Sequence, residues 1–128
     1  MIDHTGMDIS DAARSRTFYE AALAPLGYKV LMEVPVEYTG GAPVLGFGVP
    51  PKPDFWIHQG TPQTPRVHIA FAGESRAVVD AFYEAAIAAG GKDNGKPGLR
   101  PHYHADYYGA FVLDPDGHNI EACCHKPG

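Results

Sequence analysis

Short stretches in which apolar and polar residues alternate open both halves of the chain, at residues 2–9 and 66–72. Such alternation is typical of strands with one buried face. A stretch with helical spacing follows each of them, and in the second half its apolar face is made by Val78, Phe82, Ala85, Ala86 and Ala89. Ser10 and Ser75 stand where helix N-caps are expected. The pattern therefore predicts a strand and then a helix in each half.

The remainder of each half predicts three further strands. Residues 29–38 and 43–49 resemble a hairpin around Gly40–Gly41, and residues 54–59 form another alternating run. In the second half, residues 92–106 have little periodicity and predict a short strand and a long loop. Residues 107–113 and 118–124 predict the last two strands, which the tight turn DPDG at 114–117 joins.

A repeated segment divides the chain into two equal halves. FYEAALA at residues 18–24 returns as FYEAAIA at 82–88, an offset of 64 residues in a chain of 128. His4 and His68 stand at matching positions before these segments. Repetition of this length indicates a duplicated supersecondary unit. We therefore expect one α+β domain over residues 1–128, with module 1 at about 1–60 and module 2 at about 66–126.

Composition narrows the function classes. The chain is 45% hydrophobic and 20% charged, with a net charge of −5, and its ten basic residues are scattered. Scattered basic residues argue against nucleic acid or an anionic membrane as the partner. The first ten residues, MIDHTGMDIS, do not resemble a secretory signal, so a cytoplasmic location is expected. Cys123 and Cys124 are adjacent and are expected to stay reduced.

The two matching histidines suggest a metal site. If the modules pack with pseudo-twofold symmetry, His4 and His68 face each other across one concavity, and Glu121 on the last strand is the candidate carboxylate. Two imidazoles and a carboxylate suit Fe(II), Mn(II), Ni(II) or Zn(II). A single histidine in a strand is more often a structural or surface residue, and it is the matched pair that favours a metal.

Three segments carry a resemblance to a known family. They are IDHTGMDISDAARSRTFYEAALAPLGY at 2–28, HIAFAGESRAVVDAFYEAAIAAGG at 68–91 and AFVLDPDGHNIEA at 110–122. The chain resembles the vicinal oxygen chelate superfamily, also called the glyoxalase/bleomycin resistance protein/dioxygenase superfamily. The resemblance implies two tandem βαβββ modules, related by pseudo-twofold symmetry, whose strands form a cupped, mostly antiparallel sheet around a divalent metal.

The resemblance also implies the ligands. The first-strand histidines of the two modules correspond to His4 and His68, and the last-strand glutamate corresponds to Glu121. Glyoxalase I relatives have a fourth ligand, a glutamate on the last strand of the first module, where this chain has DFWIHQ. Matching the Ile-Glu pair to Ile-His puts His58 there, whereas the strict offset puts Ile57 there. The three-ligand pattern is more similar to thiol transferases of the fosfomycin-resistance type or to extradiol dioxygenases.

Other polar and aromatic residues are candidates for substrate contact or proton transfer. HYH at 102–104 is either a second metal site or part of a loop over the cup mouth. The candidate bases are a metal-bound hydroxide, His104 and Tyr107, and the candidate substrate contacts are Arg100, His102, Trp56 and Tyr108. An aromatic residue in a strand more often packs in the core, and this applies to Trp56.

The function that follows is a metal-dependent enzyme that binds two neighbouring oxygens of a small-molecule substrate. Glyoxalase-like lyase, thiol transferase and dioxygenase chemistry all fit the resemblance. The alternative is a non-catalytic protein that sequesters a small molecule, as bleomycin-resistance members do. A homodimer is compatible with either, since the superfamily completes its cup within one chain or between two.

Overall fold

The computed structural model describes all residues, 1–128. Each half has one strand, one helix and three more strands. Module 1 comprises β1 (Thr5–Ile9), α1 (Ala12–Leu23), β2 (Lys29–Glu33), β3 (Val44–Gly48) and β4 (Phe55–Gln59). Module 2 comprises β5 (His68–Ala72), α2 (Arg76–Ala88), β6 (Lys92–Leu99), β7 (Tyr108–Leu113) and β8 (Asn119–Cys124). The predicted α+β fold with two βαβββ modules is confirmed.

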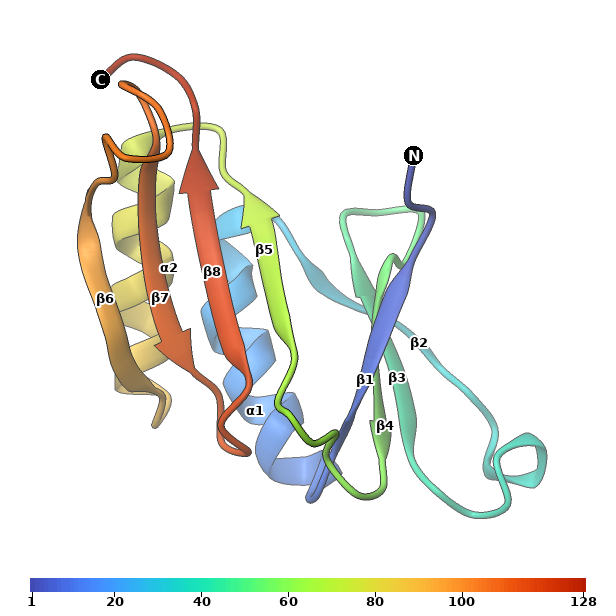
Figure 1. The fold of residues 1–128 in the computed structure, drawn as a ribbon. Coiled ribbons are helices and arrows are strands. Elements are labelled where there is room, and N and C mark those ends of the chain that lie inside the picture. Colours follow the sequence, from blue (N-terminus) through green and yellow to red (C-terminus); the bar gives the residue numbers. More distant parts are fainter.

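The strands form two four-stranded sheets, in the orders β1-β4-β3-β2 and β5-β8-β7-β6. Within each sheet the first pair is parallel and the other pairs are antiparallel. The sheets lie side by side with β1 and β5 as neighbouring edges (Figure 1), but these two strands do not pair. The expected cup is therefore an open pair of sheets in the single chain.

One hydrophobic core joins the two modules. It contains 20 buried residues from both helices and both sheets. Phe18 and Tyr19 of α1 lie in it, and the Tyr19 ring packs edge-to-face against Phe55 of β4 with ring centroids 5.1 Å apart. Because side chains alternate along a strand, every second residue of each sheet points away from the helices. We call that side of each sheet its open face.

The two helix caps differ from each other. Ser75 caps α2 as predicted, since its hydroxyl accepts a hydrogen bond from the Val78 amide at 3.2 Å. The expectation that Ser10 caps the first helix is wrong. Asp11 is the N-cap of α1 and accepts from the Arg14 amide at 3.1 Å. Ser10 instead contacts Asp116, a residue far along the chain, and is thereby drawn away from the helix end.

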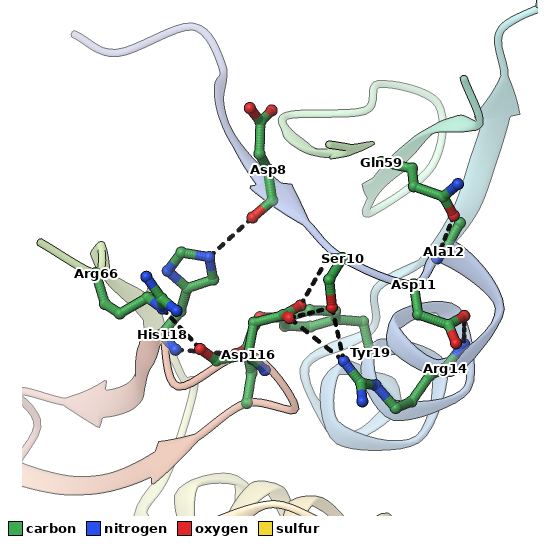
Figure 2. Close-up of polar contacts among 11 residues, drawn as sticks. Asp8, Ser10, Asp11, Ala12, Arg14, Tyr19, Gln59, Arg66, Asp116 and His118 are labelled. Atoms are coloured by element: carbon green, nitrogen blue, oxygen red, sulfur yellow. Dashed lines mark hydrogen bonds and ion pairs between the residues drawn. The ribbon is translucent and has the colours of Figure 1, made fainter. Parts of the chain in front are cut away.

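Residues of the turn between β7 and β8 form hydrogen bonds with the start of module 1 (Figure 2). His118 is fully buried, and its Nδ1 accepts a hydrogen bond from the Val67 amide at 3.0 Å. The other nitrogen, Nε2, therefore carries the proton and donates to the Asp8 carbonyl at 2.9 Å. The Asp116 carboxylate accepts from the Ser10 amide at 3.1 Å. These contacts set how the two modules, and hence their open faces, lie relative to each other.

Neither α1 nor α2 has the length and hydropathy that a membrane-crossing helix requires.

Candidate metal centre and its relatives

His68 and Glu121 lie together on the open face of module 2. The parallel pairing of β5 with β8 places Ala70 opposite Glu121 and His68 opposite Asn119. His68 precedes Ala70 by two residues and therefore lies on the same face of the sheet. The His68 Nε2 atom lies 3.3 Å from Glu121 Oε1. The carboxylate is only 2% exposed, whereas the imidazole is half exposed. The pair therefore joins a buried acceptor to a ring that solvent or a ligand can reach.

The protonation of His68 follows from its second contact. Its Nδ1 lies 3.0 Å from the Asn119 carbonyl oxygen, which only accepts hydrogen bonds, so Nδ1 carries a proton. In the neutral ring, Nε2 then presents a lone pair to Glu121. Two acceptors at this separation need a proton or a cation between them. The Phe111 ring stacks on the His68 ring, with ring centroids 6.2 Å apart, and supports this orientation of the imidazole.

Tyr107 contacts the second oxygen of the Glu121 carboxylate. Its hydroxyl donates to Glu121 Oε2. Gly109 makes this contact possible, because a Cβ there would come within 3.1 Å of Glu121 Oε2 and 3.2 Å of the Tyr107 ring. Burial, and then the hydrogen bond to Glu121, raises the pKa of Tyr107 well above its usual range. Tyr107 is therefore a hydrogen-bond donor near neutral pH and does not suit the expected role of a base.

Glu121 lacks a fixed positive partner. The ion pairs of the chain join Lys and Arg to other carboxylates, and histidine is the only basic residue paired with Glu121. A buried carboxylate without a compensating charge is expensive. The chemistry of this pair, an imidazole nitrogen and a carboxylate oxygen, therefore fits a divalent cation.

His4 lies apart from this pair. Its Nδ1 atom contacts Asp3 Oδ1 at 2.7 Å, and the same carboxylate binds Lys52 Nζ at 2.6 Å. Its Nε2 atom has no partner in the chain. His4 and His68 both line a hollow of about 370 Å³ along β1 and β5. No group of three or more His, Cys, Asp or Glu side chains converges on one point, however, so one chain does not complete the expected three-ligand set.

The register of β4 corrects the expectation for His58. In β1 and β4, Gly6 pairs with Trp56, just as Ala70 pairs with Glu121 in module 2. Trp56 therefore occupies the place equivalent to Glu121, and His58 the place of Cys123. The strict 64-residue offset fails because the chain between the first strand and its parallel partner strand is one residue longer in module 2 than in module 1. The His58 ring instead lies 3.5 Å from Asp8.

Arg100 and Tyr108 are engaged elsewhere. The Arg100 guanidinium donates to the carbonyls of Gly98 at 2.9 Å and Lys96 at 2.7 Å. The Tyr108 hydroxyl donates to Asp80 of α2 at 2.6 Å, which places Tyr108 on the helix side of the sheet. Neither side chain contacts the His68–Glu121 pair, although the Arg100 guanidinium lies 5.4 Å from the centroid of the Phe111 ring. Tyr108 points to the face of the sheet opposite to this pair, and the substrate contacts expected of both residues stay predictions.

His102 and His104 do not form a site together. They lie in the turn between β6 and β7 and not on an extended strand, which agrees with the loop alternative and not with a second metal site on one side of a strand. The His102 ring packs on Tyr103 at 4.3 Å. His104 Nε2 lies 2.8 Å from Nδ1 of His125. His104 therefore packs over the end of β8, near Tyr107 but without contact to Glu121.

Several residues of the site were not singled out from the sequence. The Asn119 carbonyl fixes the His68 tautomer, Phe111 stacks on its ring and Gly109 leaves space for Glu121. Gly109 did carry a signal, because a glycine inside a strand often marks the close approach of another group. The roles of Asn119 and Phe111 depend on the strand register, for which the sequence held no comparable mark.

Comparison with known proteins identifies the family of the chain. A sequence model of the Glyoxalase/Bleomycin resistance protein/Dioxygenase superfamily matches residues 1–122. The chain belongs to this superfamily. A search of the curated proteins gave no match.

Solved structures of this glyoxalase superfamily share the fold. A glyoxalase/bleomycin resistance protein from Albidiferax ferrireducens T118 is 26% identical, with a TM-score of 0.72 over 97% of this chain and 98% of that one. A glyoxalase/bleomycin resistance protein/dioxygenase family enzyme from Burkholderia phytofirmans PsJN is 18% identical, with a TM-score of 0.70 over 98% of both chains. Glyoxalase I from Zea mays is 22% identical, with a TM-score of 0.65 over 99% of this chain but 45% of that one.

Proposed function

We propose that this protein is a metal-dependent enzyme that acts on a small molecule, with glyoxalase-like lyase chemistry as the first candidate. The contact that carries the proposal is the one between His68 Nε2 and Glu121 Oε1, at 3.3 Å. In the neutral form of His68, a lone pair and a buried carboxylate oxygen face each other there, with no Lys or Arg paired with Glu121. A divalent cation satisfies both atoms, and its identity among Fe, Mn, Ni and Zn remains for experiment.

The third ligand in this proposal is His4 of the partner subunit. Within one chain His4 lies apart from the pair, although its Nε2 atom has no partner and its side chain is 62% exposed. The open faces of the two sheets provide the surfaces on which a second copy would pack. A symmetric dimer then contains two equivalent sites, because each copy supplies His68 and Glu121 to one site and His4 to the other.

The chain's own residues have defined roles in such a site. A bound divalent metal would supply positive charge that stabilises two neighbouring oxygens of the substrate. Asn119 holds His68 in the tautomer that leaves Nε2 free. Tyr107 keeps its proton and orients Glu121 through Oε2, which leaves Oε1 directed toward His68. Such partners commonly set the orientation and affinity of metal ligands.

The second candidate is a protein that binds and sequesters a small molecule without catalysis. The absence of a complete three-ligand cluster within one chain is the observation that favours it. It predicts that the purified protein has no bound metal and that its melting temperature does not rise with added Ni, Zn, Mn or Fe, because only a ligand of the native state stabilises it.

Elemental analysis of protein purified without added metal separates the two functions. We expect about one divalent ion per chain in the wild type and loss of most of it in His68→Ala, since removal of one of three ligands weakens such sites strongly. His102→Ala is the matched control, because His102 packs on Tyr103 outside the site, and it should keep its metal. Undiminished metal in His68→Ala would contradict the proposed ligand set.

A further inference from the structure

Trp56 is framed by glycines on the open face of module 1. The strand pairing places Gly6 of β1 and Gly46 of β3 on either side of it, in one row across three strands. The indole is therefore the only side chain at these three positions, and Met32 of β2 follows beyond Gly46 in the same row. Glycine inside a strand weakens it and often marks the close approach of another group, so two glycines beside one tryptophan indicate a place shaped around the ring.

The ring itself lies against Gly46. A Cβ at Gly46 would come within 2.8 Å of the indole atoms Cη2 and Cζ3. A Cβ at Gly6 would lie 3.3 Å from the Trp56 Cβ. Any larger residue at these two positions would press on Trp56 or its backbone. The glycines thus let the indole lie close to the sheet, where it is partly exposed and lines a hollow.

Above this surface is a hollow of about 480 Å³. Trp56, Gly6, Val44 and Pro53 form its apolar part, and the polar part is formed by Asp3, His4 and Lys52. The volume is in the range of small-molecule sites, which are mostly apolar with a few placed polar groups. Lys52 is neutralised by Asp3, so the free atom of the polar edge is Nε2 of His4.

We propose that Trp56 is a stacking platform for a planar, conjugated ring of the substrate, with the polar substituents of that ring directed toward the proposed metal position beside His4. The inference rests on the proposed function, because His4 is also a proposed metal ligand. It adds the substrate class: a flat unsaturated ring rather than a flexible aliphatic chain. A flat ring gains face-to-face or edge contact with indole, which a puckered saturated ring of the same size cannot match.

The test uses the single tryptophan of the chain, whose indole N–H gives one side-chain signal in a nitrogen–proton NMR spectrum. The protein as purified is titrated with 2-naphthoate and, separately, with its saturated analogue decahydro-2-naphthoate. We expect 2-naphthoate to shift the indole signal and to bind roughly 3- to 10-fold more tightly than the analogue. Trp56→Leu should abolish this preference, and Trp56→Phe should keep part of it.

A glycine variant tests the frame around the ring. Gly46→Ala should displace the indole and reduce the preference for 2-naphthoate. Gly60→Ala is its control, because the nearest atom to a Cβ there is 3.4 Å away, and it should behave as the wild type. Equal affinity for both probes, no binding of either, an unmoved indole signal, or a preference that survives Trp56→Leu would each overturn the proposal.

Metal content separates this inference from the function on which it rests. Trp56→Leu should retain the metal of the wild type, because Trp56 supplies no ligand. Metal retained together with no ring preference contradicts the stacking platform alone. A ring preference in a protein that binds no metal contradicts the metal-dependent function and leaves a binding site for planar molecules.

Discussion

At the scale of single residues, the site depends on which atoms carry protons. The Asn119 carbonyl fixes the proton of His68 on Nδ1, and the Tyr107 hydroxyl is donated to Glu121. The sequence indicated His68 and Glu121 as partners through the repeat and the family resemblance. It could not show their supporting contacts, because these depend on atoms brought together by strand pairing. Tyr107 was expected as a base, but its surroundings make it a donor.

The raised pKa of Tyr107 gives a prediction for stability at high pH. A tyrosine in the unfolded chain has a pKa of about 10, whereas the pKa of folded Tyr107 is higher, so it keeps its proton to higher pH. The folded state then binds more protons, so its stability is full below about pH 10 and declines as pH rises beyond it. Tyr107→Phe should show a shallower decline than the wild type, measured by urea unfolding from about pH 8 to about pH 11. Identical slopes for the two proteins would contradict this.

At the scale of elements, the sequence predicted every strand and both helices, because short alternating runs and helical spacing are local signals. No local signal in the sequence determines the register between β1 and β4. A difference of one residue between the modules changed the residue equivalent to Glu121 from Ile57 or His58 to Trp56. Only the pairing of strands far apart in sequence fixes this register, so the sequence alone left it open.

The equivalence of Trp56 and Glu121 predicts that a carboxylate at position 56 becomes a fourth ligand. Trp56→Glu should bind the metal more tightly than the wild type, by roughly 10-fold, as an added anionic ligand strengthens a divalent site. Trp56→Gln is the matched control with the same side-chain length and no charge. Calorimetric titration with Ni or Zn measures both, and equal affinity of the two variants would refute the equivalence.

At the scale of the whole molecule, the two modules share one core and a set of polar contacts at the β7–β8 turn. We call these contacts, made by Asp116 and His118, the polar seam. His118 is part of that seam and bridges Val67 and Asp8, which belong to different modules. Its fully buried position distinguishes it from the other histidines named here as site candidates. This structural role could not be predicted from the sequence, because both partners of His118 are backbone atoms of other segments.

Removal of the His118 ring should weaken the whole fold. His118→Ala leaves a cavity and two partly buried backbone groups without partners, which together cost about 2–5 kcal/mol. Urea unfolding should show this loss in a single transition, because one core joins the modules. His102→Ala, at an exposed position, should change stability by less than about 0.5 kcal/mol. A comparable loss in both variants would contradict the role of the seam.

The arrangement of two copies has the largest consequence for function. One chain brings together His68 and Glu121 and leaves His4 apart. In the proposed dimer, the partner subunit's His4 therefore completes each metal site. This part could not be predicted from one sequence, since duplication fits a cup within one chain as well as a cup between two.

Metal binding by a mixture of two variants tests this claim most directly. His4→Ala and Glu121→Ala each lack one ligand, and neither should bind metal tightly alone. After the two are unfolded and refolded together, half of the dimers are mixed, and each mixed dimer has one intact site. We expect recovery of about one quarter of the wild-type metal content. No recovery in the mixture, or full metal content in His4→Ala alone, would contradict it.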